Sequence, residues 1–191
     1  MYPNQSSQNF KALTVHKEND DAIVNIESRS LDSLPKGDLL VKVEYSSLNY
    51  KDALSASCAH GVTKKYPHTP GIDASGIVEK SDTDNFPLGT KVIITGFDLG
   101  MNTSGGFAEY IRVPKSWVVK CPSNMTTKES MILGTAGLTA GLSVKAISEK
   151  VQLRGSRIVV SGATGGLGSL SIKLLSHLGA EITAITGKIH K

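Results

Sequence analysis

The stretch Arg157-Ile158-Val159-Val160-Ser161-Gly162-Ala163-Thr164-Gly165-Gly166-Leu167-Gly168 decides the fold class of this chain. A short β-branched run predicts a strand, the glycines predict a tight turn, and leucines at helical spacing predict a helix to about His177. A dinucleotide-binding fold begins with such a strand–turn–helix unit. A glycine-rich turn in an unrelated α/β unit is the alternative interpretation.

The glycines follow the spacing Gly-x-x-Gly-x-x-Gly, with one additional glycine, instead of G-x-G-x-x-G. The turn needs a residue without Cβ, the pyrophosphate needs close backbone approach, and the helix must pack tightly on the strand. Free N–H groups at the start of the helix favour a phosphate. We therefore expect the cofactor to contact Gly162, Thr164, Gly165, Gly166, Leu167 and Gly168.

A second strand is predicted over 180–186, and it ends at Thr186-Gly187-Lys188. NAD-specific sites usually carry Asp or Glu at this point, where the ribose is recognised. Glu181 lies at the start of the strand and is expected to be solvated. A hydroxyl and an ammonium suit a 2′-phosphate, so the sequence favours NADPH over NADH. The alternative is that Lys188 is an ordinary surface lysine.

The composition is that of an ordinary globular chain of 191 residues, 39% hydrophobic and 20% charged, with a net charge of +4. This length suits one domain and part of another. No stretch approaches the ~20 apolar residues of a membrane span, and Lys64-Lys65 is too small a basic group for a nucleic-acid interface. Two cysteines favour a reducing compartment. We expect a cytoplasmic protein with neither a membrane nor a nucleic-acid partner.

The chain divides into a polar, flexible leader over 1–9, a β-rich domain over 10–125 and a partial nucleotide domain over 126–191. One short helix over 50–57 interrupts the first domain, and Thr126-x-x-Glu129 is a capping box that starts a longer helix to about Ile147. Short runs between Gly, Pro and Asp predict the strands of the first domain, at about 10–16, 22–28, 39–46, 72–80, 91–95, 107–113 and 117–120.

This order of elements comes with three further motifs: Ser47-Leu48-Asn49-Tyr50-Lys51-Asp52, Pro70-Gly71-Ile72-Asp73-Ala74-Ser75-Gly76-Ile77-Val78 and Gly134-Thr135-Ala136-Gly137-Leu138-Thr139-Ala140. Together they resemble the medium-chain dehydrogenase/reductase superfamily, and above all its zinc-free quinone oxidoreductases and acrylyl-coenzyme A reductases. The resemblance runs from about Lys11 to the last residue. It implies an α/β fold, in which a GroES-like β-rich domain precedes a Rossmann-type doubly wound domain that is incomplete in this chain.

The resemblance also bears on metal. Zinc-dependent relatives carry Cys where this chain has Asn49, and Gly-His-Glu where it has Gly71-Ile72-Asp73. An isoleucine cannot ligate zinc and an amide is a poor ligand beside Cys or His. The segment 96–106 contains none of the clustered cysteines of a structural zinc lobe. We expect no zinc.

Without a metal, the resemblance implies NADPH-dependent reduction of a C=C bond in an α,β-unsaturated carbonyl compound, such as acrylyl-coenzyme A, an enone or a quinone. It places Asn49 and Tyr50 near the nicotinamide and substrate, and Thr135 near the nicotinamide end of the cofactor. An amide and a phenol there could hydrogen-bond the carbonyl oxygen as charge develops. Asp73 lies in an apolar run, where burial could perturb its pKa for catalysis.

Each of these residues has a structural alternative. Asn49 could cap the helix that begins at Tyr50, Asp73 could be an acid bonded to the backbone or to Lys51, and Thr135 could be helical packing. Lys51 and Asp52 are candidate supporting partners of Asp73, although Asp52 is expected instead to be a solvated acid in the first turn of the helix. The remaining expectations are loop histidines at His60 and His68, and core aromatics at Phe107 and Trp117.

Two functions from different classes follow from the sequence. The first is the reductase just described, in which homodimers would be in keeping with the family. The second is a cofactor-free GroES-like interaction or regulatory module, because only 23 residues follow Gly168 and an incomplete nucleotide domain leaves apolar faces uncovered.

Overall fold

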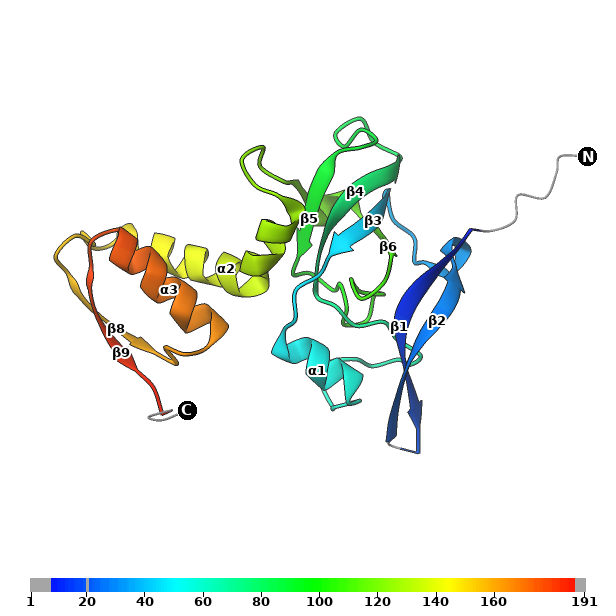
Figure 1. The fold of residues 1–191 in the computed structure, drawn as a ribbon, viewed down its shortest axis with the longest axis horizontal. Coiled ribbons are helices and arrows are strands. Elements are labelled where there is room, and N and C mark those ends of the chain that lie inside the picture. The colour runs from blue at the N-terminus through cyan, green and yellow to red at the C-terminus, as the bar shows by residue number, and fades with distance from the viewer. Residues whose placement is uncertain (1–7, 20, 188–191) are drawn as a thin grey trace, which may run out of the picture. The chain divides into compact units, whose positions relative to one another are not determined.

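The structure is a computed structural model that describes residues 8–19 and 21–187 (Figure 1). The chain divides into two units, Met1–Ile132 and Leu133–Lys191. In chain order the elements are β1 (Asn9–Glu18), β2 (Asp21–Ser30), the 3₁₀ turn Leu31–Ser33, β3 (Leu39–Tyr45), α1 (Tyr50–Ala56), β4 (Asp73–Ser81), β5 (Lys91–Thr95), β6 (Tyr110–Val113), the 3₁₀ turn Lys115–Trp117, β7 (Val118–Lys120), α2 (Thr127–Ser148), β8 (Arg157–Ser161), α3 (Gly166–His177) and β9 (Glu181–Ile185).

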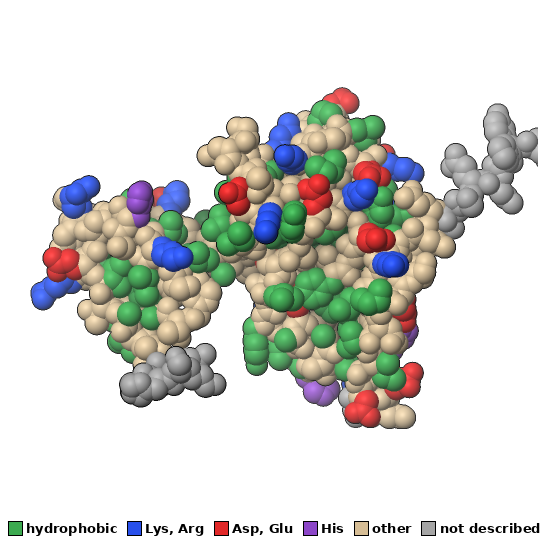
Figure 2. Space-filling view, viewed as in Figure 1, with side chains coloured by type: hydrophobic (Ala, Val, Ile, Leu, Met, Phe, Trp, Pro, Cys, Tyr) green, Lys and Arg blue, Asp and Glu red, His purple; other side chains and the backbone are tan. Residues whose placement is uncertain are grey.

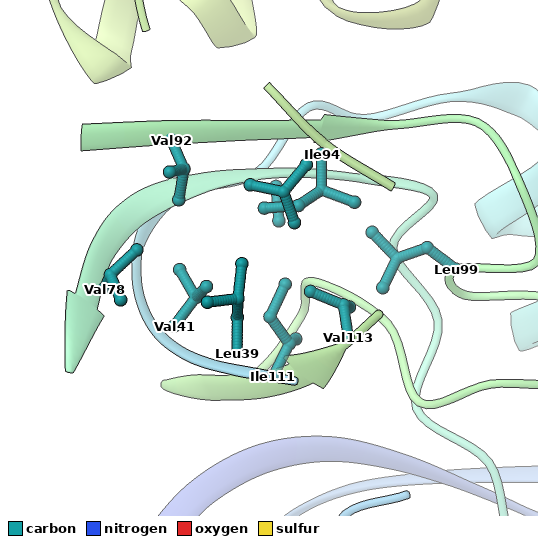
Figure 3. Packing of buried hydrophobic residues seen from close by; sticks show 10 residues of the cluster. Leu39, Val41, Val78, Val92, Ile94, Leu99, Ile111 and Val113 are labelled. Carbon is teal, nitrogen blue, oxygen red and sulfur yellow. The ribbon is translucent and has the colours of Figure 1, made fainter. Parts of the chain in front are cut away.

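The first unit is built on a five-stranded antiparallel sheet in the order β6-β3-β4-β5-β7, beside the long β1–β2 hairpin. Apolar residues from all five of its strands form one core, to which Leu99 is added from a loop. Figure 3 shows Leu39 and Val41 facing Val92 and Ile94 across this centre. The strand positions predicted from the sequence are therefore confirmed in kind, with bounds that differ by a few residues.

Three expectations about the first unit need correction. Asn9 already belongs to β1, and the backbone N–H of Leu31 donates to Gln8 O at 3.0 Å, so residues 8 and 9 are not a loose leader; residues 1–7 lie outside the described residues. The strand expected over 107–113 begins only at Tyr110, because the residues before it bond to β1 and to the 68–71 segment instead. Phe107 is only partly buried and is not in the core, whereas Trp117, also partly buried, packs against the core of the sheet as predicted.

The helix predicted after Thr126 is present, and its capping box is confirmed. The Thr126 N–H donates to Glu129 Oε2 at 2.8 Å and the Glu129 N–H donates to Thr126 Oγ1 at 3.1 Å. The Thr126 hydroxyl also donates to Glu129 Oε2 at 2.8 Å, and the two bonds that Thr126 donates to this carboxylate lower the pKa of Glu129. The helix is kinked at Gly134, whose φ of 49° and ψ of −152° are non-helical; a positive φ favours glycine.

The length and apolar composition of α2 would allow it to cross a membrane, with a mean hydropathy of 1.3. The expectation that no stretch approaches a membrane span was therefore too strict. This is weak support for a membrane partner, since helices of soluble proteins pass the same test. Moreover, the part of α2 after the kink is only about 21 Å long, shorter than the ~30 Å hydrocarbon core.

The second unit contains the predicted strand–turn–helix–strand. Strands β8 and β9 pair in parallel from Arg157↔Glu181 to Ser161↔Ile185. A small core of Val144, Leu153 and Leu175 packs against one face of this pair, through Ile158, Val160 and Ile182. Glu181 is exposed at the start of β9, as predicted.

Candidate functional site

The first group of candidate residues lies at the start of α1. Asn49 is the N-cap residue of this helix, and its Nδ2 donates to Asp73 Oδ2 at 2.9 Å. Because a carboxylate oxygen accepts and does not donate, this contact fixes which end of the amide faces Asp73. The two alternatives for Asn49 are thus compatible, since one residue both begins the helix and presents an oriented amide.

Asp73 begins β4 and has no exposed surface, whereas Leu48 and Tyr50 on either side of Asn49 are 86% and 79% exposed. Ser46 Oγ donates to the backbone oxygen of Asp73 at 2.6 Å, which ties the end of β3 to β4. Asp73 therefore offers no surface that a substrate could touch, whereas Asn49, which contacts it, is only partly buried.

Asp52 was predicted to be a solvated acid, and this prediction is wrong. Its side chain is buried and accepts three backbone N–H bonds, from Asn49 to Oδ2 at 2.7 Å and from Gly71 and Ile72 to Oδ1 at 3.1 and 2.9 Å. Burial raises the pKa of Asp52, these three bonds oppose the shift, and the charge of Asp73 adds to it. Asp52 therefore holds the start of α1 against the segment that leads into β4.

The second group of candidates is the glycine loop between β8 and α3. Gly162 has a φ of +62°, and a Cβ at Gly168 would lie 2.3 Å from Gly162 O, so both positions require glycine. Helix α3 starts at Gly166 with Gly165 as its N-cap and without a side-chain cap. The first N–H groups of a helix have no intrahelical partner. Those of Gly166, Leu167 and Gly168 could thus receive a phosphate.

Other predicted cofactor residues lie beside this loop. Thr164 Oγ1 is 3.4 Å from Thr186 Oγ1, so the loop and the end of β9 meet. A Cβ at Gly166 would come within 3.3 Å of the Cβ of Ala136, the neighbour of Thr135 in α2. The second unit therefore brings Thr135, the glycine loop and Thr186-Gly187 into one region. Lys188 lies outside the described residues.

Metal-binding side chains are not gathered in the described part of the chain: no group of three or more His, Cys, Asp or Glu side chains is placed to hold an ion there. Cys58 is buried and Cys121 is partly exposed. On the face of the first unit that Figure 2 shows, Lys and Arg side chains are interspersed with Asp and Glu.

His68, expected to be an ordinary loop residue, is buried at 4% exposure, with Nε2 2.9 Å from Gly100 O. Its buried setting depends on contacts with residues far away in the sequence, which no local pattern indicates. The bond from the Asn49 N–H to Asp52 could have been predicted from the sequence, because Asn49-x-x-Asp52 has the spacing of a capping box.

The geometry defines a β-rich domain in which an asparagine is oriented by a buried carboxylate, followed by a glycine-rich strand–turn–helix. Residues 35–123 match the alcohol dehydrogenase GroES-like domain. This match and the similar proteins described below confirm the predicted resemblance to the medium-chain dehydrogenase/reductase superfamily and the fold class predicted from the sequence.

Within this superfamily the chain is similar to the acrylyl-CoA reductase AcuI of Ruegeria pomeroyi, with 40% identity over 182 residues, covering 94% of this chain and 55% of the relative. It is also 40% identical over 179 residues to YhfP, a quinone oxidoreductase by name, of Bacillus subtilis, covering 93% of this chain and 54% of YhfP. The chain thus spans about half the length of these relatives.

Solved structures give the same picture. The yhdH oxidoreductase of Salmonella enterica in complex with NADP has a TM-score of 0.91 at 37% identity, covering 94% of this chain and 56% of that one. The B. subtilis protein yhfP with NAD bound has a TM-score of 0.81 at 36% identity, covering 93% and 61%. Both cofactors therefore occur among the similar structures.

Proposed function

We propose that this chain carries the substrate and cofactor groups of an NADPH-dependent, zinc-free reductase that acts on the C=C bond of an α,β-unsaturated carbonyl compound. The observation that carries the proposal is the Nδ2 of Asn49, held 2.9 Å from the buried carboxylate of Asp73 and flanked by exposed Leu48 and Tyr50. The names of the relatives support an acyl-coenzyme A thioester or a quinone as substrate, and an enone has the same reactive group.

Asn49 would stabilise the negative charge that develops on the carbonyl oxygen. One N–H of its Nδ2 is directed to Asp73, and the second N–H is available to the substrate oxygen. When bound, the dinucleotide would supply a hydride to the β-carbon, and a proton from water would complete the reduction at the α-carbon. A pre-oriented N–H donor stabilises the intervening enolate because it requires no reorganisation during the reaction.

Tyr50 would be the second donor at the same oxygen. Its side chain is 79% exposed and adjacent to Asn49 at the first turn of α1. Asp73 would be a positioning residue, because it is fully buried and contacts Asn49. Asp52 would fix the start of α1, on which both donors depend.

The glycine loop fits a dinucleotide pyrophosphate. A Cβ at Gly168 would collide with the backbone, and the uncapped start of α3 presents N–H groups suited to an anion. Gly162, Thr164, Gly165, Gly166, Leu167 and Gly168 would hold the phosphates. Thr135 would approach the nicotinamide, and Thr186, Gly187 and Lys188 would accommodate the 2′-phosphate that distinguishes NADPH from NADH.

Zinc is not part of this proposal. Zinc sites need Cys, His or carboxylate ligands. This chain has an amide at Asn49 and an isoleucine at Ile72, in the Gly71-Ile72-Asp73 segment, at two of the positions where zinc-dependent relatives carry ligands. With two cysteines and small-molecule substrates, we place the protein in the cytoplasm.

The direct test is a fluorescence titration of the 191-residue chain with NADPH, with NADH in parallel, followed by NADPH consumption with acrylyl-coenzyme A, an enone and a quinone. We expect a Kd for NADPH within about 1 µM to 1 mM, the range of ordinary enzyme ligands, with weaker NADH binding. Binding without turnover on any of these substrates would contradict the reductase. Absence of NADPH binding would favour the cofactor-free GroES-like interaction module.

A further inference from the structure

An open pocket lies between the tip of the β1–β2 hairpin and the loop that follows α1. Its volume is about 680 Å³, which is within the range of small-molecule sites. The residues that line it carry amino, amide and phenol groups: Lys17, Asn19, Lys64 and Tyr66. None of these four residues belongs to the proposed reductase site.

A backbone bridge brings the two sides of this pocket together. Val15 and His68 exchange two N–H···O bonds, of 2.7 and 2.9 Å, in antiparallel orientation. In such a pair, residues at equal separations from the bridge come close to one another. Past the bridge, this alignment joins the two pairs that line the pocket, Lys17 with Tyr66 and Asn19 with Lys64.

The loop side of the pocket is cationic. Residues 53–72 contain Lys64 and Lys65 and no Asp or Glu. Lys64 is exposed, and its ammonium forms no ion pair with the residues that the structure describes. Its backbone N–H donates to Asn102 Oδ1 at 3.4 Å, while the amide of Asn102 donates to the carboxylate of Asp98 at 2.9 Å. The Lys64 ammonium is therefore available to an anionic ligand.

The hairpin side adds a second cation, Lys17. The acids beside it in the hairpin, Glu18 and Asp21, lie opposite each other across the two strands. Because neighbouring positions of a strand point to opposite faces, these two carboxylates are directed away from the face that carries Lys17. Asp20 lies outside the described residues. An anion in the pocket thus meets the ammonium groups of Lys17 and Lys64, each of which has several N–H donors.

Helix α1 connects this pocket to the proposed substrate site. Asn49 caps the start of the helix, and the Tyr66 hydroxyl donates to Ser55 O at 2.8 Å near its end. The helix rises about 9 Å from Asn49 to Ser55, and the Tyr66 ring adds to this separation. The pantetheine arm of coenzyme A has about as many backbone bonds as four extended residues, so its phosphates begin roughly 14 Å from the sulphur. One molecule can therefore reach both places.

We propose that this pocket binds the phosphate groups of a coenzyme A thioester whose acyl carbonyl lies at Asn49. The inference rests on the proposed reductase and narrows its substrate to an acyl-coenzyme A, since a quinone or a simple enone has no phosphate to bind there. The phosphates accept charge-assisted hydrogen bonds from Lys17 and Lys64. These bonds are the same before and during the reaction, so they lower KM and leave kcat unchanged.

The first test compares two thioesters with the same reactive group: acrylyl-coenzyme A carries the phosphates and acrylyl-pantetheine does not. In the wild type, KM should be lower for acrylyl-coenzyme A. K64A should raise this KM about tenfold without changing kcat, as expected for the loss of a hydrogen bond to a charged group, and should not change KM for acrylyl-pantetheine. The matched control K36A changes an exposed lysine in the loop before β3 and should leave both KM values unchanged.

Coenzyme A itself provides a readout that needs no turnover. Calorimetric titration of the 191-residue chain with coenzyme A should show binding that weakens about tenfold in K64A and further in K17A/K64A. The binding should also weaken with added salt, because salt screens interactions between exposed charges.

The outcomes separate this proposal from the reductase. If enones or quinones are reduced but the wild type has equal KM values for the two thioesters, or K64A and K36A behave alike, the pocket is overturned and the reductase stands. If no substrate is reduced, the reductase fails and the titration alone decides the pocket. Absence of coenzyme A binding, or binding that folded K17A/K64A retains in full, would then overturn it.

Discussion

Asn49 Nδ2 lies 2.9 Å from Asp73 Oδ2, although 24 positions separate the two residues in the chain. The N-cap of a short helix and the first residue of a central strand are thereby joined at the point where the substrate carbonyl would bind. This bond leaves Asn49 half-buried and Asp73 fully buried. In the proposed reductase, Asn49 would be the group that the substrate reaches and Asp73 the group that orients it.

Replacement of Asn49 tests the proposed donor. N49A should lower kcat in the reduction of an unsaturated carbonyl compound by about 10²-fold with a smaller effect on KM, because the N–H acts mainly on charge that develops in the transition state. N85A, which changes an exposed asparagine, is the matched control and should leave both constants unchanged. An unaltered kcat in folded N49A would contradict the role of the amide.

Removal of the Asp52 carboxylate tests the anchor of α1. D52A leaves the N–H groups of Asn49, Gly71 and Ile72 without their acceptor, and it should lower the free energy of unfolding by about 2–4 kcal/mol. Urea denaturation measures this change. D84A removes an exposed acid and should stay within about 0.5 kcal/mol of the wild type.

The destabilisation by D52A should also depend on pH. Since burial raises the pKa of Asp52 above the unfolded value of 3.8, the folded state binds this proton more tightly. The associated stability is fully present below pH 3.8 and is lost as the pH rises through the folded pKa. The difference between wild type and D52A should thus be larger near pH 4 than at pH 7, and the reverse order would contradict this account.

His68 should make the protein less stable in mild acid. Burial lowers the pKa of His68 from 6.5, and the charge of Arg29 lowers it further. The hydrogen bond to Gly100 and the charge of Asp98 partly oppose this decrease. The unfolded state therefore binds the proton more readily. Stability is complete above the unfolded pKa of 6.5 and falls as the pH drops through it towards the folded pKa, by at most about 1.4 kcal/mol per pH unit.

Denaturation curves between about pH 5 and 8 measure this slope. H68Q keeps a donor for Gly100 O but does not titrate, so the difference in stability between the two proteins should vary with pH. Parallel pH profiles for wild type and H68Q would show that other groups cause the loss.

Gly168 tests the phosphate cradle. G168A places a Cβ 2.3 Å from Gly162 O, a backbone atom that can yield only if the start of α3 shifts. We expect a loss of about 1–3 kcal/mol in stability and a loss of NADPH binding in the fluorescence titration.

The matched control is G141A, at an exposed position in α2 where a Cβ meets no atom within 4 Å. It should leave NADPH binding unchanged and stabilise the helix by up to about 1 kcal/mol. Equal NADPH affinities for G168A and the wild type would exclude the loop as the pyrophosphate site.

The sequence by itself determined the elements and their order, because local patterns specify them. Short runs between Gly, Pro and Asp predicted the strands, Thr126-x-x-Glu129 predicted the start of α2, and the glycines at 162, 165 and 168 predicted the turn before α3. Each of these patterns involves residues that are close together in the chain, so the local sequence is enough to predict the element.

The burial and the hydrogen-bond partners of the titratable groups in the first unit could be found only from the tertiary structure. The local sequence predicts a solvated acid at Asp52, but Gly71 and Ile72, from a distant part of the chain, donate hydrogen bonds to its buried carboxylate. His68 is buried by contact with Gly100 in the same way. The free-energy cost of burying a charged group depends on how deeply it is buried and on its hydrogen-bond partners. Both depend on residues from distant positions in the chain that only the folded structure brings together.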